Sequence, residues 1–253
     1  MIKVGIVGHD PYTIPLMDGL GRQPDFQVIG AYNHDPTPFS KPISKKIPVY
    51  CSKSNLSFFK ERGIKVSGFL EEFIESADAF LEYDSVEMSI KISYGSSGIV
   101  IRPYEVLLER LSASIPIKDI SLEEISNDLF CCPFFRAFKV KLKLAEKIDL
   151  NWIKDSLLSS PRVLVISGGV YLQDLCLFLL VAAPYSQFSV SVILRSIRVV
   201  SEDSSSLELI SLLGYMICLP EAIDTLRESN GVKRDFSRGI TDKHLSIKGG
   251  LIL

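Results

Sequence analysis

The residues with the most evident chemical potential lie in one short loop near the start of the chain. This loop, Gly8–Thr13 (GHDPYT), follows a strand-like apolar run at Lys3–Gly8 (KVGIVG) and precedes a helix predicted from Ile14. A glycine-rich loop between a strand and a helix can hold phosphate groups through backbone N–H groups. Only the first glycine of the Gly-x-Gly-x-x-Gly spacing is present here, because Asp10 and Thr13 stand at the other two positions.

The remaining residues of this loop argue against a phosphate site. The carboxylate of Asp10 would repel a diphosphate while occupying the helix terminus itself, and Pro11 and Tyr12 add bulk where close approach is needed. Thr13 is a plausible N-cap for the following helix. We therefore expect a loop that is capped by its own side chains.

A second group of polar residues follows the next predicted strand, Phe26–Tyr32 (FQVIGAY). Asn33, His34 and Asp35 stand where the ribose of a dinucleotide is normally bound by an acidic residue, or a 2′-phosphate by a basic one. The competing interpretation is a turn into the proline-rich stretch Asp35–Pro48, and we favour it because Asn, Asp and Pro form turns for backbone reasons of their own. The vestigial cofactor-binding set is thus Gly8, His9, Asp10, Tyr12, Thr13, Asn33 and His34.

The cysteines show no metal-binding or disulfide pattern. They are odd in number, mostly lie within apolar runs and lack C-x-x-C spacing: Cys51, Cys131, Cys132, Cys176 and Cys218. We expect buried, reduced thiols and no metal site.

The first hundred residues alternate between short apolar runs and amphipathic helical segments. Strands are predicted at Pro48–Cys51, Ile64–Val66, Ala79–Tyr83 and Gly98–Arg102, and helices at Leu56–Arg62 and Phe69–Ser76. This alternation favours a parallel sheet.

The pattern changes in the second half. After a helix or loop at Leu107–Leu129, in which Ser121 resembles the start of a capping box before Ile125, residues Phe135–Leu144 alternate as in a strand with one wet face. A helix capped by Asp149 over Leu150–Leu158 and further strands then follow, at Arg162–Ser167, Tyr185–Leu194 and Ile197–Ser201. A long apolar helix, Leu207–Leu219, and a second helix through Arg227 complete an open α+β sheet covered on one face by helices.

These patterns predict an α/β protein of two domains. Residues 1–105 form a Rossmann-like domain, residues 106–219 a smaller, truncated α+β domain, and residues 220–253 a C-terminal helix that returns toward the first domain, plus a tail.

Composition limits the classes of partner. Twenty-eight basic and thirty acidic residues give a net charge of −2, so there is no global field that would draw nucleic acid. The longest uncharged apolar run, Leu175–Ala183, is too short to span a membrane. We expect a cytoplasmic protein.

Four segments together resemble a known family. Lys3–Gly30, Phe59–Ser85, Asp149–Ile166 and Ile217–Arg227 are similar, in this order, to the archaeal (type II) glyceraldehyde-3-phosphate dehydrogenases. The resemblance implies an NAD(P)-binding-type domain followed by a catalytic-type domain.

The functional motifs of that family are missing. The chain has neither the Ser-Cys-Asn-Thr-Thr segment that carries the family's nucleophile nor the later His-Gly-Pro segment that carries its base. Cys131-Cys132-Pro133 is no equivalent, because it aligns with a later strand. The family's Asp-Ala-Thr-Pro turn becomes Glu82-Tyr83-Asp84-Ser85, which places Asp84 where phosphates would lie. We expect no catalytic residue and no cofactor, with NAD(P) disfavoured.

Three functions are compatible with these features. The first is a non-catalytic relative, a pseudoenzyme that acts as a binding, scaffolding or regulatory subunit and associates with itself through the strand from Phe135 or with another dehydrogenase subunit. The second is an NAD(P)-dependent oxidoreductase or nucleotide-binding enzyme with a site rebuilt around His9, Asp10, Tyr12 and His34. The third is a small-molecule sensor without chemistry.

Overall fold

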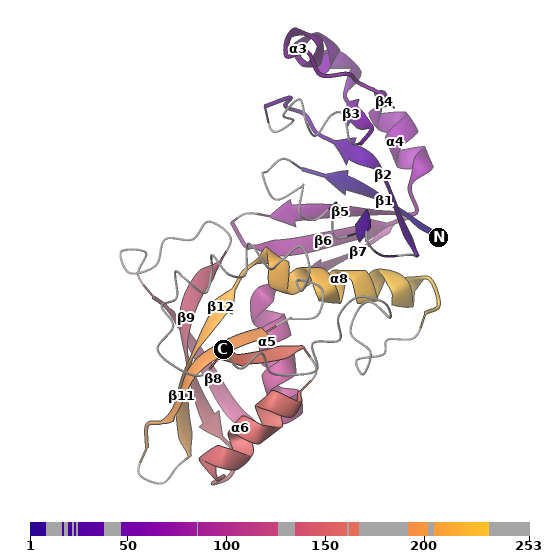
Figure 1. Ribbon diagram of the computed structural model, residues 1–253. Coiled ribbons are helices and arrows are strands. Elements are labelled where there is room, and N and C mark those ends of the chain that lie inside the picture. The colour runs from indigo at the N-terminus through magenta and orange to yellow at the C-terminus, as the bar shows by residue number, and fades with distance from the viewer. Residues whose placement is uncertain are drawn as a thin grey trace. The chain divides into compact units, whose positions relative to one another are not determined.

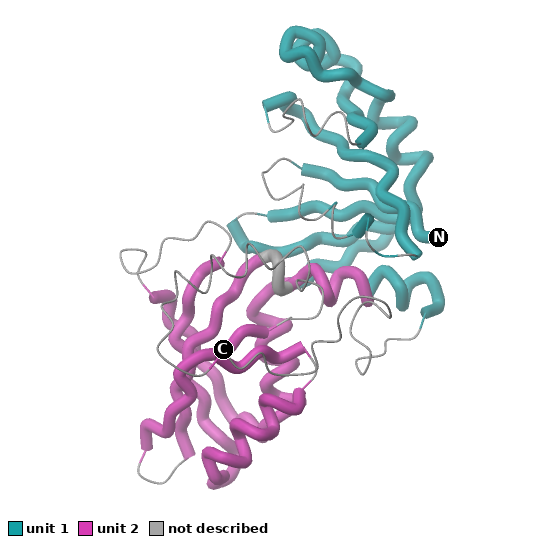
Figure 2. Tube along the Cα trace, in the orientation of Figure 1, with its two compact units in different colours: residues 1–101, 225–232 teal, residues 102–224, 233–253 magenta. Residues whose placement is uncertain are grey.

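The computed structural model of the 253-residue chain describes residues 1–8, 17, 20–21, 23, 25–37, 47–84, 86–125, 135–160, 162–166, 192–201 and 205–232. The chain divides into two compact units (Figure 2). Unit 1 comprises Met1–Ile101 and Thr225–Val232, and unit 2 contains Arg102–Asp224. Within the described ranges, the structure has no helix with the length and apolar character needed to cross a membrane.

Unit 1 is built on a seven-stranded sheet with the order β4-β3-β2-β1-β5-β6-β7 (Figure 1). Its strands are β1 (Ile2–Val7), β2 (Phe26–Tyr32), β3 (Val49–Cys51), β4 (Gly68–Phe69), β5 (Ala79–Asp84), β6 (Ser89–Tyr94) and β7 (Ser97–Ile101). The first five strands pair in parallel, as the alternation of strands and helices predicts. The central strand β1 is buried at Val4 and Ile6.

The far side of this sheet differs from the prediction. Strand β6 was not expected, and it pairs antiparallel with both β5 and β7. Residues Tyr94 and Ser97 pair across a two-residue turn in which Gly95 has φ +53°, a conformation that suits glycine. A tight hairpin therefore replaces a further parallel crossover.

The strand predicted at residues 64–66 is wrong. The strand that pairs with β3 is β4, which begins at Gly68. Ile64 is buried, and its N–H donates to the carbonyl of Phe59 at 3.0 Å, at the end of helix α3 (Leu56–Glu61). Its apolar character thus reflects packing beyond a helix end. A short 3₁₀ helix, η1 (Lys53–Asn55), precedes α3.

Helix α4 (Leu70–Ser76) packs on the parallel strands through Phe73, which is fully buried. The ring of Phe73 lies 4.9 Å from that of Tyr50, 5.2 Å from that of Phe80 and 6.0 Å from that of Tyr32. Of the helix predicted from Ile14, residues 17, 20 and 21 are described, and all three are helical.

Unit 2 contains a five-stranded sheet with the order β10-β11-β12-β9-β8. Its strands are β8 (Ile117–Glu124), β9 (Arg136–Leu144), β10 (Val163–Ile166), β11 (Val192–Val199) and β12 (Ser206–Leu213). Helices α5 (Pro103–Ser114) and α6 (Leu150–Ser159) lie on one face of this sheet (Figure 1). Asp149 caps α6 as predicted, because its side chain accepts hydrogen bonds from the N–H groups of Asn151 and Trp152.

Two predictions for this half of the chain are wrong. Ser121 begins no capping box, since it lies in β8, where Ile120 and Leu122 alternate with polar residues in a strand paired to β9. The long helix expected at residues 207–219 is strand β12 followed by a single helix, α8 (Tyr215–Ser229), which continues past Pro220. Leu207 and Leu209 are both fully buried at alternate positions, which is the period of a strand.

Candidate functional site

The candidate site is the edge of the unit 1 sheet at which β1, β2 and β5 end. From β1 the chain adds β2, β3 and β4 on one side and then places β5 on the other side of β1 (Figure 1). Open α/β sheets bind ligands outside the carboxyl ends of their strands at such a reversal. Gly8, Asn33 and Asp84 all lie at this edge.

Gly8 follows β1 and lies close to the ends of β2 and β5. Its N–H donates to the carbonyl of Tyr32 at 3.2 Å, and a Cβ at this position would lie 4.0 Å from the carbonyl oxygen of Tyr83. The φ angle of Gly8 is +110°, which L-residues rarely adopt. The one glycine kept from the phosphate-loop spacing therefore has a conformational reason to be glycine.

Asn33 contributes a buried amide at the same edge. Only 2% of its surface is exposed, and its Oδ1 accepts a hydrogen bond from the N–H of Asp35 at 3.2 Å. Its Nδ2 is buried and has no acceptor among the residues that the structure describes. Leaving a buried donor unpaired costs about 1–3 kcal/mol, so this amide has the capacity to bind a further acceptor.

His34 and Asp35 are exposed, and their polar groups bind neighbouring parts of the chain. Nδ1 of His34 lies 3.2 Å from the Tyr32 hydroxyl, and its carbonyl accepts a hydrogen bond from Nδ2 of Asn55 at 2.7 Å. Oδ1 of Asp35 accepts from the N–H of Thr37 at 2.7 Å. These bonds give the segment the character of a turn stabilised by its own side chains.

Asp84 ends β5 next to the end of β1, where we expected it to face a phosphate. Its Oδ1 accepts hydrogen bonds from the N–H groups of Val86 (2.8 Å) and Glu87 (3.0 Å). The carboxylate therefore closes the turn between β5 and β6. Its side chain is exposed, so a negative charge stays at this edge.

The other predicted members of the site, His9, Asp10, Tyr12 and Thr13 of the loop, lie outside the described residues, as do the thiols Cys131, Cys132 and Cys176. Within the described ranges, no group of three or more His, Cys, Asp or Glu residues is arranged to hold a metal ion.

The two described cysteines are buried and free of disulfides, as predicted for them. Cys51 lies in β3 and Cys218 in α8, and neither has exposed surface. Burial raises the pKa of the Cys51 thiol. Burial, and then the nearby charges of Glu221 and Glu105, raise the pKa of Cys218 well above its ordinary value.

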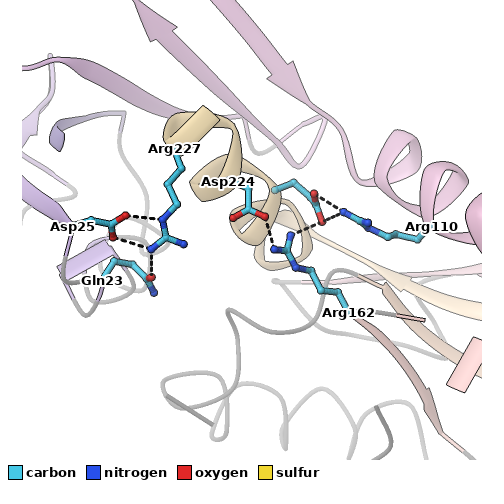
Figure 3. A network of polar contacts seen from close by, with 7 residues as sticks. Gln23, Asp25, Arg110, Arg162, Asp224 and Arg227 are labelled. Atoms are coloured by element: carbon cyan, nitrogen blue, oxygen red, sulfur yellow. Dashed lines mark hydrogen bonds and ion pairs between the residues drawn. The ribbon is translucent and has the colours of Figure 1, made fainter. Parts of the chain in front are cut away.

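A buried ion network holds the first part of α8 within unit 2 (Figure 3). Nη2 of Arg110 donates to both carboxylate oxygens of Glu221 at 2.7 Å. Arg162 donates to Glu221 at 3.1 Å through Nη1 and to Asp224 through Nη2. All four side chains are buried, and their formal charges balance.

The last part of α8 has a separate anchor within unit 1 (Figure 3). Arg227 donates to Asp25 through Nε (2.6 Å) and Nη2 (2.8 Å), and to Oε1 of Gln23 at 3.0 Å. Its guanidinium also lies over the ring of Phe26, 5.5 Å from the centroid. Sequence reasoning did not single out these residues, although Glu221, Asp224 and Arg227 recur every third residue in α8.

No family model matches the chain. Among curated proteins it is 30% identical to the glyceraldehyde-3-phosphate dehydrogenase of Pyrobaculum calidifontis over 83 residues, which are 32% of this chain and 24% of that protein. It is 32% identical to the enzyme of Metallosphaera sedula over 101 residues, 39% of this chain and 30% of that protein. The chain resembles archaeal glyceraldehyde-3-phosphate dehydrogenases. The predicted resemblance is thus confirmed over about a third of the chain, and the match spans about a quarter of the first relative's length.

Two solved structures share a weaker likeness over most of the chain. Aspartate semialdehyde dehydrogenase II from Vibrio cholerae, complexed with ASA, has a TM-score of 0.44 and 10% identity and covers 91% of this chain and 99% of its own. Aspartate semialdehyde dehydrogenase with NADP from Candida albicans has a TM-score of 0.43 and 9% identity and covers 92% and 100%. These TM-scores are low, so the fold of this chain is described by its own strand order and not by these two structures.

Proposed function

We propose that this chain is a non-catalytic relative of glyceraldehyde-3-phosphate dehydrogenase that acts as a binding, scaffolding or regulatory subunit. Two facts support the proposal together. The unit 1 sheet keeps the strand order that positions a ligand site. The sequence has neither of the motifs that carry the nucleophile and the base in the family it resembles.

The absence of the family's nucleophile and base motifs from the sequence carries the proposal, and the two described thiols, Cys51 and Cys218, agree with it. A thiolate is the attacking species in cysteine chemistry, and it forms where a helix N-terminus or a nearby cation lowers the pKa. Cys51 and Cys218 are instead fully buried, and the pKa of each is raised. At neutral pH both are protonated thiols that a substrate does not reach.

A steady-state assay tests this function. The full chain is mixed with glyceraldehyde-3-phosphate, inorganic phosphate and either NAD⁺ or NADP⁺, and formation of NAD(P)H is followed by absorbance. An archaeal glyceraldehyde-3-phosphate dehydrogenase serves as the positive control. We expect no turnover above the protein-free rate, and sustained turnover would refute the proposal.

A second candidate, an oxidoreductase or other protein that binds NAD(P), rests on Asn33 and Gly8. Both lie at the strand ends where a dinucleotide would sit, and the unpaired Nδ2 of Asn33 could donate to a ribose hydroxyl. A bound NAD(P)⁺ would supply a hydride acceptor. The exposed carboxylates of Asp35 and Asp84 at the same edge disfavour its phosphates.

Calorimetric titration separates the two candidates. If the chain is a binder of dinucleotides, NAD⁺ or NADP⁺ saturates the protein and Asn33→Ala weakens binding about fivefold or more, the value of one lost hydrogen bond. Asn151→Ala, at an exposed position in unit 2, is the control and leaves the affinity unchanged. Absence of saturable heat with either dinucleotide favours the non-catalytic binding role.

A further inference from the structure

Strand β7 is the last strand on one side of the unit 1 sheet (Figure 1). The outer edge of an end strand carries backbone N–H and C=O groups that no neighbouring strand binds. Proteins protect such edges with very short strands, charged side chains, proline or a covering segment. β7 contains no charged residue and no proline, and Ser97, Gly98 and Ile99 are exposed.

The other end strands in the described part of the chain are protected. β4 has two residues. β10 is buried at three of its four positions. β8 carries four charges among its eight residues: Lys118, Asp119, Glu123 and Glu124. An exposed, uncharged edge is therefore a particular feature of β7 and not a general property of the two sheets.

The register of the hairpin between β6 and β7 shows which backbone groups face outward. Tyr94 and Ser97 close a two-residue turn, and the pair that closes such a turn is hydrogen-bonded in both directions. Bonded and non-bonded pairs alternate, so Gly98 and Val100 direct their N–H and C=O groups away from β6. Within the described ranges, neither residue bonds to backbone outside this hairpin. These groups can pair with a further strand.

The apolar row on the buried face of this sheet reaches solvent at β7. Leu81, Ile92 and Ile99 are neighbours in register on β5, β6 and β7. Leu81 and Ile92 are fully buried, whereas 38% of the surface of Ile99 is exposed. A further strand with a β-branched residue opposite Ile99 would complete this row.

Gly98 leaves space on the opposite face of the sheet. A Cβ added to it would meet the carbonyl oxygen of Ile92 at 3.5 Å and Oγ of Ser93 at 4.0 Å, both ordinary contact distances. A large side chain on a neighbouring strand can cover a glycine at a sheet edge. An aromatic residue opposite Gly98 therefore fits an added strand.

Area and charge decide which occupant fits. Pairing β7 with β7 of a second copy joins two strands of five residues, which buries far less than the roughly 1,200 Å² of a stable interface. An acidic or basic segment finds no counter-charge on β7. An extended, uncharged segment gains backbone hydrogen bonds along its length and can contact both faces of the edge, which is the basis of strand addition.

We propose that β7 binds an extended, uncharged segment of a partner protein by strand addition, with a β-branched residue opposite Ile99 and an aromatic residue opposite Gly98. This inference concerns unit 1 alone and does not rest on whether the chain is catalytic.

Fluorescence anisotropy with a defined probe tests the proposal on the full chain. The probe is the fluorescein-labelled peptide Thr-Thr-Val-Tyr-Thr, which in antiparallel register places Val opposite Ile99 and Tyr opposite Gly98. The comparison peptide is N-methylated at its Tyr and its second Thr, the residues whose N–H groups would donate to β7. We expect saturable binding of the probe and binding about tenfold or more weaker for the comparison peptide, because two hydrogen bonds are lost.

Two variants test the edge itself. Ile99→Lys places a charge on β7 and should weaken binding of the probe about fivefold or more. Its matched control is Val86→Lys, which adds the same charge at an exposed position between β5 and β6 and should leave the affinity unchanged. Val100→Pro removes an outward N–H without removing a bond to β6, and it should weaken binding about threefold or more.

The N-methylated peptide and Ile99→Lys keep the proposal falsifiable if Val100→Pro does not fold. Absence of saturable binding up to millimolar probe, equal binding of the two peptides, or equal affinities of Ile99→Lys and Val86→Lys would each overturn it. A dimer in sedimentation that Ile99→Lys converts to monomer would also overturn it, because a second copy would then occupy the edge of β7.

Discussion

Arg110 and Glu221 form a two-pronged ion pair across 111 residues of sequence, with both carboxylate oxygens 2.7 Å from the same guanidinium nitrogen. Their side chains are 6% and 5% exposed. Arg162 shares the Glu221 carboxylate and also binds Asp224, so two acids of α8 neutralise two arginines that are distant from each other in sequence. The position of α8 within unit 2 therefore depends on a charge balance that fails if one member is removed.

Glu221→Gln should lower the free energy of unfolding by about 3–5 kcal/mol, because it removes the carboxylate that two buried guanidinium groups share and leaves an uncompensated buried positive charge. Urea unfolding followed by circular dichroism measures the change. The control is Glu71→Gln, which breaks the exposed pair with Lys53 and should cost less than about 1 kcal/mol. Equal losses for the two variants would show that the network adds no stability beyond that of a surface pair.

The ion pair between Asp25 and Arg227 predicts that the free energy of unfolding decreases at low pH. Partial burial raises the pKa of the Asp25 carboxyl, but the hydrogen bond and the charge of Arg227 outweigh it, so the pKa is lowered. This contribution to stability is present above the ordinary carboxyl pKa of about 4 and is lost as the pH falls through the lower folded value. Asp25→Asn should be less stable than wild type at neutral pH and should lose less stability on acidification. Parallel pH profiles of the urea midpoint would contradict this assignment.

Gly30 marks a close approach between β2 and the segment before β3. A Cβ added there would lie 2.6 Å from the carbonyl oxygen of Pro48, and the φ angle is +155°. Gly30→Ala should therefore destabilise the protein by about 1–3 kcal/mol. Gly21→Ala, where a Cβ meets nothing within 4 Å, should be neutral or slightly stabilising. Thermal unfolding of both variants checks the difference, and the same melting temperature for both would refute it.

The raised thiol pKa values predict slow chemical modification. In a variant with Cys131, Cys132 and Cys176 replaced by Ser, only Cys51 and Cys218 remain. A disulfide reagent at neutral pH should label both thiols slowly, at a rate that rises on addition of urea, because labelling requires opening of the buried sites. Labelling in native buffer at the rate of a small-molecule thiol would contradict the burial of these groups.

Local patterns predicted much of the parallel sheet and its helices. The apolar run that ends at Gly8 is β1, the segment beginning at Phe26 is β2, and Asp149 caps α6 through hydrogen bonds to the second and third residues after it. These features follow from interactions between near neighbours, to which propensity and spacing apply directly.

The wrong predictions concern segments whose sequence pattern is compatible with both a helix and a strand. Residues 207–219 are apolar enough for one helix, but residues 207–213 form a strand because β12 pairs with β9 and β11. Ser121 has the spacing of a capping box, but β9 supplies a strand partner for its backbone. Tertiary pairing overrides local preference in both cases.

The polar network and the unpaired amide were beyond sequence reasoning for a different reason. Arg110 meets Glu221, and Asn33 loses contact with water, only after distant segments have packed. The identity of each residue was visible, but its partners and burial were not. The chemistry of a polar residue depends on these surroundings, which sequence spacing does not report.

A single-turnover experiment tests the central claim most directly. The full chain, in excess over glyceraldehyde-3-phosphate, is mixed rapidly with NAD⁺ or NADP⁺, while absorbance reports hydride transfer and intact mass spectrometry reports acyl-enzyme. A non-catalytic chain forms no NAD(P)H in the first turnover, and its mass is unchanged. A burst of NAD(P)H in step with acylation of a cysteine would contradict the account and would identify the chain as a working dehydrogenase.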